Sequence, residues 1–211
     1  MRRVKGSGST PAVARRCSSR VAIALTIALA ALSIAAPSRA ALKPGDRAPD
    51  FTAEASLGGK VFSFSLAAAL AKGAVVLYFY PAAFTTGCTI EAHDFAEAVD
   101  AYHALGATVI GVSHDDIGTL KRFSVSECRS KFAVAADGDQ HIMKSYDAVL
   151  KRAPKYANRV SYVIAPDGHV IYAYTSLDPE RHVENTLDAL RKWEAGVTAA
   201  RSTTSSPPPP R

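Results

Sequence analysis

Apolar runs and apolar periodicities divide the central part of the chain into short strands and helices. Residues 74–80 are continuously apolar and rich in β-branched and aromatic side chains, which is typical of a strand covered on both faces. Apolar residues recur at helical spacing within 86–106, and residues 108–112 form a second buried strand. Weaker patterns predict a half-buried strand around Phe62 and Phe64, helices over 66–71, 117–129 and 142–149, and a strand over 132–134.

The second half of the pattern ends in a hairpin and a helix. Residues 159–164 predict a strand, 166–168 a turn and 169–174 the returning strand. Asp178 is the expected N-cap of the last helix, with Pro179 at its first position. The apolar face of that helix carries Val183, Leu187 and Leu190. This order predicts an α/β fold with a central mixed sheet flanked by helices, and it is similar to a thioredoxin-like fold.

Residues 1–40 have the composition of a secretory signal peptide. They contain seven Lys or Arg residues and no Asp or Glu. An apolar stretch occupies 21–36, and Ser38 and Ala40 provide the small residues of a cleavage site. The stretch is shorter than the ~20 residues that a spanning helix needs, so we expect cleavage after Ala40 rather than an uncleaved anchor. The leader predicts a secreted protein of the bacterial periplasm that leaves the membrane after cleavage.

The charge of the chain belongs mainly to that leader. The full sequence carries 25 basic and 19 acidic residues and a net charge of +6, whereas 18 basic and 19 acidic residues remain after residue 40. A net charge near −1 gives no reason to expect nucleic acid or an anionic membrane as a partner. Residues 198–211 are rich in Ser and Pro and predict a disordered tail. A single domain is therefore expected over 41–197.

Cys88 is the strongest candidate for chemistry. It follows the predicted strand 74–80 across a short loop and falls in the first turn of the helix predicted over 86–106. A thiol at this position faces unpaired N–H groups and the positive end of the helix dipole. These surroundings favour the thiolate, which is the form that attacks electrophiles. Pro81, Thr85 and Cys88 together form the pattern P-x-x-x-T-x-x-C.

This pattern resembles the active-site motif of the peroxiredoxins, and the resemblance covers nearly all of residues 41–196. The leading segment 42–51 is similar to the segment at the start of the family's domain, and 158–168 is similar to its Arg-bearing strand and hairpin. Within the family, the sequence Cys-Thr-Ile-Glu at 88–91 resembles the bacterioferritin-comigratory or Q-type subgroup. The resemblance implies a thiol peroxidase.

The resemblance also implies a role for each of five residues. The Cys88 thiolate would attack one peroxide oxygen and become a sulfenic acid. Arg159 would place a permanent positive charge beside the sulfur, and the Thr85 hydroxyl would orient the peroxide oxygens. Pro81 would shield the thiolate from water, and Glu91 would orient Arg159 or backbone groups. Taken singly, these positions also fit a buried structural thiol at 88, a surface cation at 159 and an ordinary helix N-cap at 85.

The other cysteine of the predicted domain, Cys128, has three candidate roles. Many members of the Q-type subgroup carry a resolving cysteine five residues after the first, but His93 occupies that position here. Cys128 would condense with the sulfenic acid of Cys88, form a structural disulfide, or stay inert in a one-cysteine enzyme. Cys17 lies in the leader. His93 and the histidines at 103, 114, 141, 169 and 182 lack metal-ligand spacing and are expected at the surface.

The sequence thus predicts a peroxidase for hydrogen peroxide and small organic hydroperoxides. No metal, haem or flavin is expected, because the sulfur carries the chemistry. Electrons would come from a thioredoxin-like or glutaredoxin-like donor, and both a monomer and a homodimer fit. One alternative is a thioredoxin-type disulfide oxidoreductase or copper-delivery protein, which the absence of closely spaced cysteines disfavours. Another is a binding module on the same fold that has lost activity.

Overall fold

The computed structural model describes residues 41–204, which fall within one compact unit. The predicted signal peptide at 1–40 and the last residues of the predicted tail, 205–211, lie outside the described residues. Export and cleavage therefore stay predictions. Among residues 41–204, no helix combines the length and the apolar character needed to cross a bilayer.

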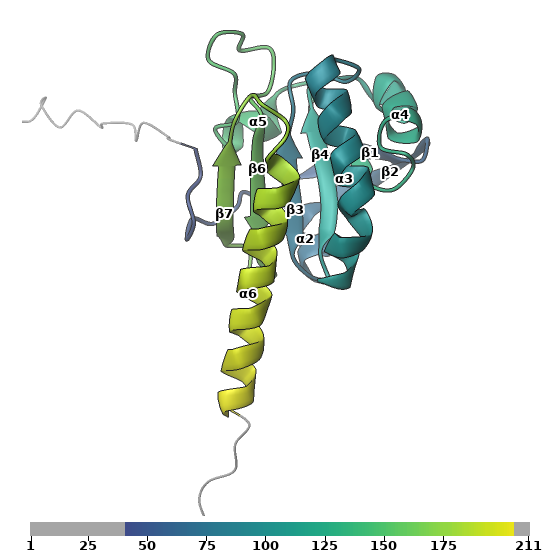
Figure 1. Ribbon diagram of the computed structural model, residues 1–211. Helices are drawn as coiled ribbons and strands as arrows, with labels where there is room; N and C mark the ends of the chain where they lie inside the picture. Colours follow the sequence, from purple (N-terminus) through teal and green to yellow (C-terminus); the bar gives the residue numbers. More distant parts are fainter. Residues whose placement is uncertain (1–40, 205–211) are drawn as a thin grey trace, which may run out of the picture. The chain divides into compact units, whose positions relative to one another are not determined.

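A seven-stranded mixed sheet forms the centre of the described residues (Figure 1). Its order is β2-β1-β5-β4-β3-β6-β7, with β4 parallel to both neighbours and every other pair antiparallel. The strands are β1 Thr52–Leu57, β2 Lys60–Ser65, β3 Val75–Phe79, β4 Thr108–Ser113, β5 Ala133–Ala136, β6 Val160–Ile164 and β7 Val170–Thr175. The predicted combination of parallel strands and a late antiparallel hairpin is confirmed.

Helices cover both faces of this sheet. They are α2 Leu66–Leu70, α3 Thr86–Ala104, α4 Ile117–Ser126, α5 His141–Ser145 and α6 His182–Thr204. In Figure 1, α3, α4 and α6 lie on the near face, while α2 and α5 lie on the far face. The layered α/β arrangement confirms the predicted thioredoxin-like fold.

The central strand β3 contributes to a separate core on each side of the sheet. Its odd-numbered residues Val75, Leu77 and Phe79 pack with α2 and α5, while Val76 and Tyr78 pack with α3, α4 and α6. All five residues are buried, with at most 1% of the surface of each exposed. This double burial explains the continuous apolar run, since successive side chains of a strand point to opposite faces.

Several elements differ from the pattern-based prediction. Strand β1 was not predicted, because its sequence TAEASL lacks the β-branched and aromatic character of the other strands. The helix predicted over 117–129 ends at Ser126, since Arg129 and Ser130 adopt positive φ angles. The helix predicted over 142–149 ends at Ser145.

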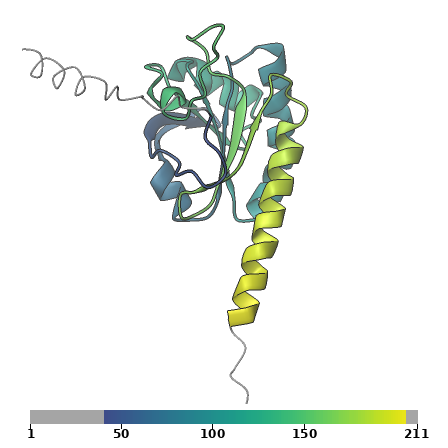
Figure 2. The same ribbon diagram turned by 90° about the vertical axis from the view of Figure 1, so that its left-hand side faces the viewer.

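The last helix begins later and continues further than predicted. Asp178 does not cap it, because its carboxylate accepts the N–H of Glu180 in the turn that precedes His182. The helix then runs to Thr204, seven residues beyond the predicted domain boundary at 197, since no Gly or Pro follows Gly196 within it. Its C-terminal half extends beyond the sheet in both views (Figures 1 and 2).

Candidate active site

The junction between β3 and α3 places Cys88 as the sequence predicts. The chain leaves β3, passes Phe84 at a positive φ of 62°, and enters α3 through Thr85 in an extended conformation. Cys88 follows in the first helical turn and is a free thiol with 1% of its surface exposed. The N–H groups of this turn have no earlier carbonyl within the helix to bind, so they add positive potential around the sulfur.

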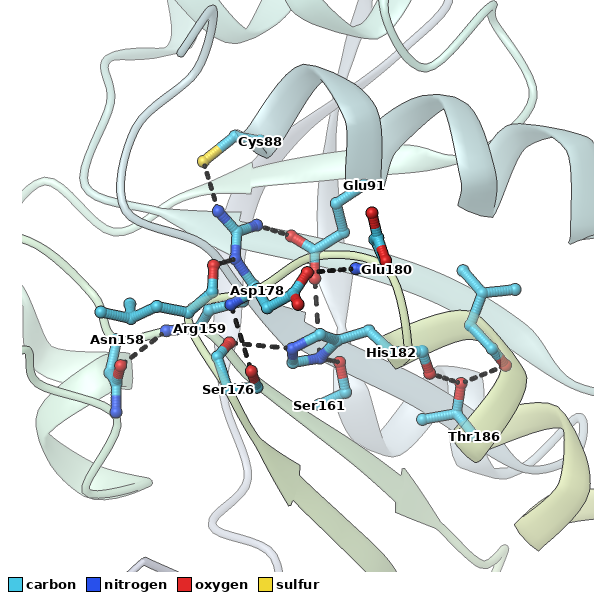
Figure 3. Close-up of polar contacts among 12 residues, drawn as sticks. Cys88, Glu91, Asn158, Arg159, Ser161, Ser176, Asp178, Glu180, His182 and Thr186 are labelled. Carbon is cyan, nitrogen blue, oxygen red and sulfur yellow. Dashed lines mark hydrogen bonds and ion pairs between the residues drawn. The ribbon is translucent and has the colours of Figure 1, made fainter. Parts of the chain in front are cut away.

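Sheet pairing brings Arg159 to the same place from a distant part of the chain. Val160, the first residue of β6, pairs with Phe79 at the end of β3. Arg159 therefore lies level with the start of the loop that leads to Cys88. Its Nη2 atom is 3.4 Å from Cys88 Sγ, and only 4% of the residue is exposed (Figure 3). The predicted meeting of Arg159 with the sulfur is present in the structure.

Three contacts fix the guanidinium of Arg159. Nη2 points to Cys88, Nη1 donates to Glu91 Oε2, and Nε donates to the backbone oxygen of Leu177 at 3.1 Å (Figure 3). Burial alone would lower the pKa of Arg159, but the negative charges of Glu91 and Cys88 outweigh burial and raise that pKa. The group thus stays positively charged beside the sulfur.

Glu91 lies one turn after Cys88 on α3 and is fully buried. Burial raises the pKa of the Glu91 carboxyl from 4.5 to about 8, against the opposing influence of Arg159. One guanidinium that is shared with a second acidic group offsets only part of the hydration that the buried carboxyl loses. The predicted supporting position of Glu91 next to Arg159 is present in the structure.

Thr85 and Pro81 lie in the loop that carries the chain into α3. Thr85 occupies the N-cap position of α3 without a side-chain capping bond, and its hydroxyl donates to the backbone oxygen of Ala82 at 2.9 Å. Thr85 is exposed, whereas Pro81 is half-buried. The expected roles of Thr85 in orienting peroxide and of Pro81 in shielding sulfur stay predictions.

Cys128 is the second free thiol of the described residues. It is fully buried just after α4, and it belongs to the same apolar cluster as Cys88. Burial raises its pKa well above the ordinary thiol value, with a smaller contribution from Glu127. Cys128 is therefore protonated in the reduced protein, and its three candidate roles stay predictions.

His182 is a residue of the site that the sequence prediction placed wrongly. It was expected at the surface, but it is fully buried in the first turn of α6, 3.6 Å from Glu91 Oε1 (Figure 3). The only sequence signal was indirect, since Ser161, which contacts His182, lies two residues after Arg159 on the same strand. His93, by contrast, is 37% exposed and pairs with Glu127 at the end of α4.

Comparison with known proteins identifies the family. The AhpC/TSA family pattern matches residues 44–173. This chain belongs to that peroxiredoxin family. The chain is similar to a wheat protein named chloroplastic peroxiredoxin Q, with 35% identity over 118 residues, which cover 56% of this chain and 54% of the wheat protein. A rice (Oryza sativa subsp. japonica) chloroplastic peroxiredoxin Q is 32% identical over 180 residues, covering 78% of this chain and 80% of the rice protein.

A solved structure gives the same assignment. The crystal structure of peroxidoxin BcpB from Mycobacterium tuberculosis matches with a TM-score of 0.65 and 27% identity, covering 72% of this chain and 97% of that chain. The prediction that this chain resembles the peroxiredoxins, and the Q-type subgroup in particular, is confirmed. Membership of the family implies thiol peroxidase activity.

Proposed function

We propose that this peroxiredoxin reduces hydrogen peroxide and small organic hydroperoxides through a sulfenic acid formed at Cys88. The observation that carries the proposal is the 3.4 Å contact between Arg159 Nη2 and Cys88 Sγ at the start of α3. A buried guanidinium and a helix N-terminus together favour the thiolate, which is the reactive form of the residue.

The reaction follows from this geometry. The thiolate sulfur attacks one peroxide oxygen, an S–O bond forms and the O–O bond breaks. The sulfur is oxidised to sulfenic acid, and the departing hydroxide or alkoxide takes a proton to give water or an alcohol. Arg159 stabilises the negative charge that develops on the leaving oxygen. The Thr85 hydroxyl would turn from Ala82 toward the peroxide when substrate binds.

A groove beside Phe84, four residues before Cys88, supports the choice of peroxides with a small organic group as substrates. Phe84 precedes the catalytic helix and is 47% exposed, while its ring contacts Phe123 at a centroid separation of 5.2 Å. Phe84 lines a groove of about 650 Å³ together with Gly59, Lys121, Arg122, Val125 and Ser126. An apolar wall of this kind suits an alkyl substituent.

The sulfenic acid needs a thiol to complete the cycle. The burial and protonation of Cys128 support reduction by an external thioredoxin-like or glutaredoxin-like protein, because a protonated thiol is a poor nucleophile. A bridge between Cys88 and Cys128 is the other route. Mass spectrometry of the non-reduced protein after one equivalent of peroxide distinguishes a Cys88–Cys128 bridge from a lone sulfenic acid.

The decisive experiment compares peroxide consumption by the wild type, Cys88→Ser and the matched control Cys128→Ser in a stopped-flow assay. We expect rapid oxidation in the wild type and in Cys128→Ser, and none in Cys88→Ser. Equal consumption by all three proteins would exclude Cys88 as the nucleophile. No consumption by any of the three proteins would favour an inactive binding module, as would a Cys88 thiol that is still labelled after mild peroxide treatment.

The cellular setting is a further part of the proposal. We expect the protein in the bacterial periplasm, because residues 1–40 have the charge and apolar pattern of a leader. A fusion of these residues to a reporter that is active only after export would test this location. Retention of the reporter in the cytoplasm would contradict it.

A further inference from the structure

A buried pair of titratable residues lies behind Arg159, and the peroxide reaction described above does not use it. Glu91 from α3 and His182 from α6 are both fully buried. The nearest atoms of the pair, Glu91 Oε1 and His182 Nδ1, are 3.6 Å apart (Figure 3). The helices that carry them pack against each other, so neither side chain faces solvent.

The partners of His182 determine where its ring carries a proton. Nε2 lies 3.0 Å from the backbone oxygen of Ser176, which only accepts hydrogen bonds, so Nε2 is protonated. Nδ1 lies 2.8 Å from Ser161 Oγ. Burial lowers the pKa of His182 from 6.5 to about 4, so the ring is neutral at pH 7 and Nδ1 is an acceptor. The single lone pair of Nδ1 therefore faces two neighbours that can donate to it, the Ser161 hydroxyl and the Glu91 carboxyl in its protonated form.

One oxygen of the Glu91 carboxyl, Oε1, then faces the lone pair of His182 Nδ1. Oε2 accepts from Arg159, but Oε1 accepts no hydrogen bond from any residue in the described range 41–204. An ionised oxygen facing the lone pair of His182 Nδ1 in a buried site would be repelled by it. A proton between Oε1 and Nδ1 turns that repulsion into attraction, and it satisfies the unpartnered oxygen.

The charges around Arg159 give an independent argument for this proton. The guanidinium contacts two acidic groups, the Cys88 thiolate and the Glu91 carboxyl. Two anions against one cation would leave a net negative charge in a buried site, which is costly. A neutral Glu91 leaves Arg159 and the thiolate as a balanced pair.

The other ionisable groups around Glu91 and His182 do not supply a charge that would replace the proton on Glu91. Asp94, on α3, opposes the ionisation of Glu91, and Asp178, in the turn before α6, is too weak an influence to keep His182 charged. The charged groups that act on the pair are Asp94 from α3, Arg159 just before β6 and Asp178 from the turn before α6, and the Tyr174 ring from β7 packs against His182.

We propose that Glu91 and His182 together hold one buried proton, and that this proton keeps Arg159 available to the Cys88 thiolate. The catalytic meaning of this proposal rests on the proposed peroxidase function. Glu91 and His182 are positioning residues in it, since they act on the sulfur through Arg159 and do not touch the peroxide.

The kinetic test uses Glu91→Gln, whose neutral amide imitates the protonated carboxyl. Each protein's rates are compared with its own rate at pH 7, because Glu91 contacts Arg159 and its replacement changes the absolute rate. The wild-type rate should fall above about pH 8, as Glu91 ionises and Arg159 is shared, whereas the variant should show no such fall. An unchanged alkaline fall in the folded variant would overturn the proposal.

The role of His182 is tested by the pH at which the rate with hydrogen peroxide decreases. In His182→Leu the neutral carboxyl of Glu91 loses its acceptor, so Glu91 should ionise more readily and the fall should move to lower pH. His182→Gln keeps an acceptor and should shift the fall less. An unchanged position in both folded variants would remove His182 from the pair.

Infrared difference spectroscopy tests the proton without any enzyme activity. We expect a carboxylic acid C=O band in the reduced wild type at pH 6.5 that is lost in Glu91→Gln. The matched control Asp94→Asn, which removes another carboxyl whose pKa is raised by burial, should keep the band. If the band is present and no variant consumes peroxide, the peroxidase function fails while the buried proton stands. If the wild type is active and the band is absent, the buried proton fails alone.

Discussion

The stability of the protein should fall as the pH rises from 6.5 to 8, and Glu91→Gln should abolish that fall. Glu91 binds its proton more tightly in the folded state, where burial raises its pKa to about 8, than in the unfolded state, where the pKa is 4.5. Between these two values the folded protein holds more protons than the unfolded chain. Stability is therefore greatest below the lower value and is lost as the pH approaches 8.

The size of the effect follows from the width of the pH window. One proton difference changes the free energy of unfolding by about 1.4 kcal/mol for each pH unit. His182 acts in the opposite direction, because its folded pKa of about 4 lies below the unfolded value of 6.5, so its contribution to stability is lost as the pH falls. The two slopes largely cancel below pH 6.5. The net loss between pH 6.5 and 8 should be roughly 1–2 kcal/mol.

Urea unfolding of the wild type and Glu91→Gln, followed by circular dichroism at several pH values, measures this difference. We expect the unfolding midpoint of the wild type to decrease across the window and that of the variant to stay nearly constant. Parallel curves for the two proteins would show that Glu91 does not titrate in this range, and they would refute the reasoning. The assay needs no peroxide, so a failure would concern the buried carboxyl alone.

Three further predictions concern the sulfur and the packing. In stopped-flow measurements, Arg159→Met should lower the rate at which Cys88 reacts with hydrogen peroxide by roughly 10- to 150-fold. This factor corresponds to the loss of one hydrogen bond to a charged group. An unchanged rate would contradict the role of Arg159. Gly73→Ala would place a Cβ 2.0 Å from the backbone oxygen of Gly106. This overpacking should lower the free energy of unfolding by about 1–3 kcal/mol in urea titrations, and a neutral effect would contradict the packing. Alkylation at pH 7 followed by mass spectrometry should label Cys88 well before Cys128, whose pKa burial raises; the reverse order would be inconsistent with a protonated Cys128.

Most of the sheet could be predicted because its central strands have apolar side chains on both faces. The runs at 74–80 and 108–112 are mainly apolar, which predicts burial in the interior. They correspond to β3 and β4. Strand β1 could not be found in this way. Its Ala and Ser residues are small enough to be buried against α4, but they carry no periodic signal, and its place depends on pairing with β2 and β5.

The residues of the site also differ in how far the local sequence predicts them. Cys88 and its loop are contiguous in the sequence, so a short motif could reveal them, and Arg159 could be found only through resemblance to a known family. His182 had neither kind of signal. Its burial depends on α6 packing over β6 and α3. The apolar face of Val183, Leu187 and Leu190 predicts that packing, but it does not indicate that His182 is buried with it.

The packing of α6 affects the chemistry of the site, because α6 and the segment before it contact Arg159 and Glu91. The segment between β7 and α6 supplies the Leu177 oxygen that holds Arg159 Nε, and the first turn of α6 supplies His182. The opposite side of the guanidinium is held by Glu91 from α3, the helix that also carries Cys88. A shift of the start of α6 would therefore change the orientation of Arg159 and the neutrality of Glu91 together. The charge that faces the sulfur is set by the packing of two helices as much as by the motif around the cysteine itself.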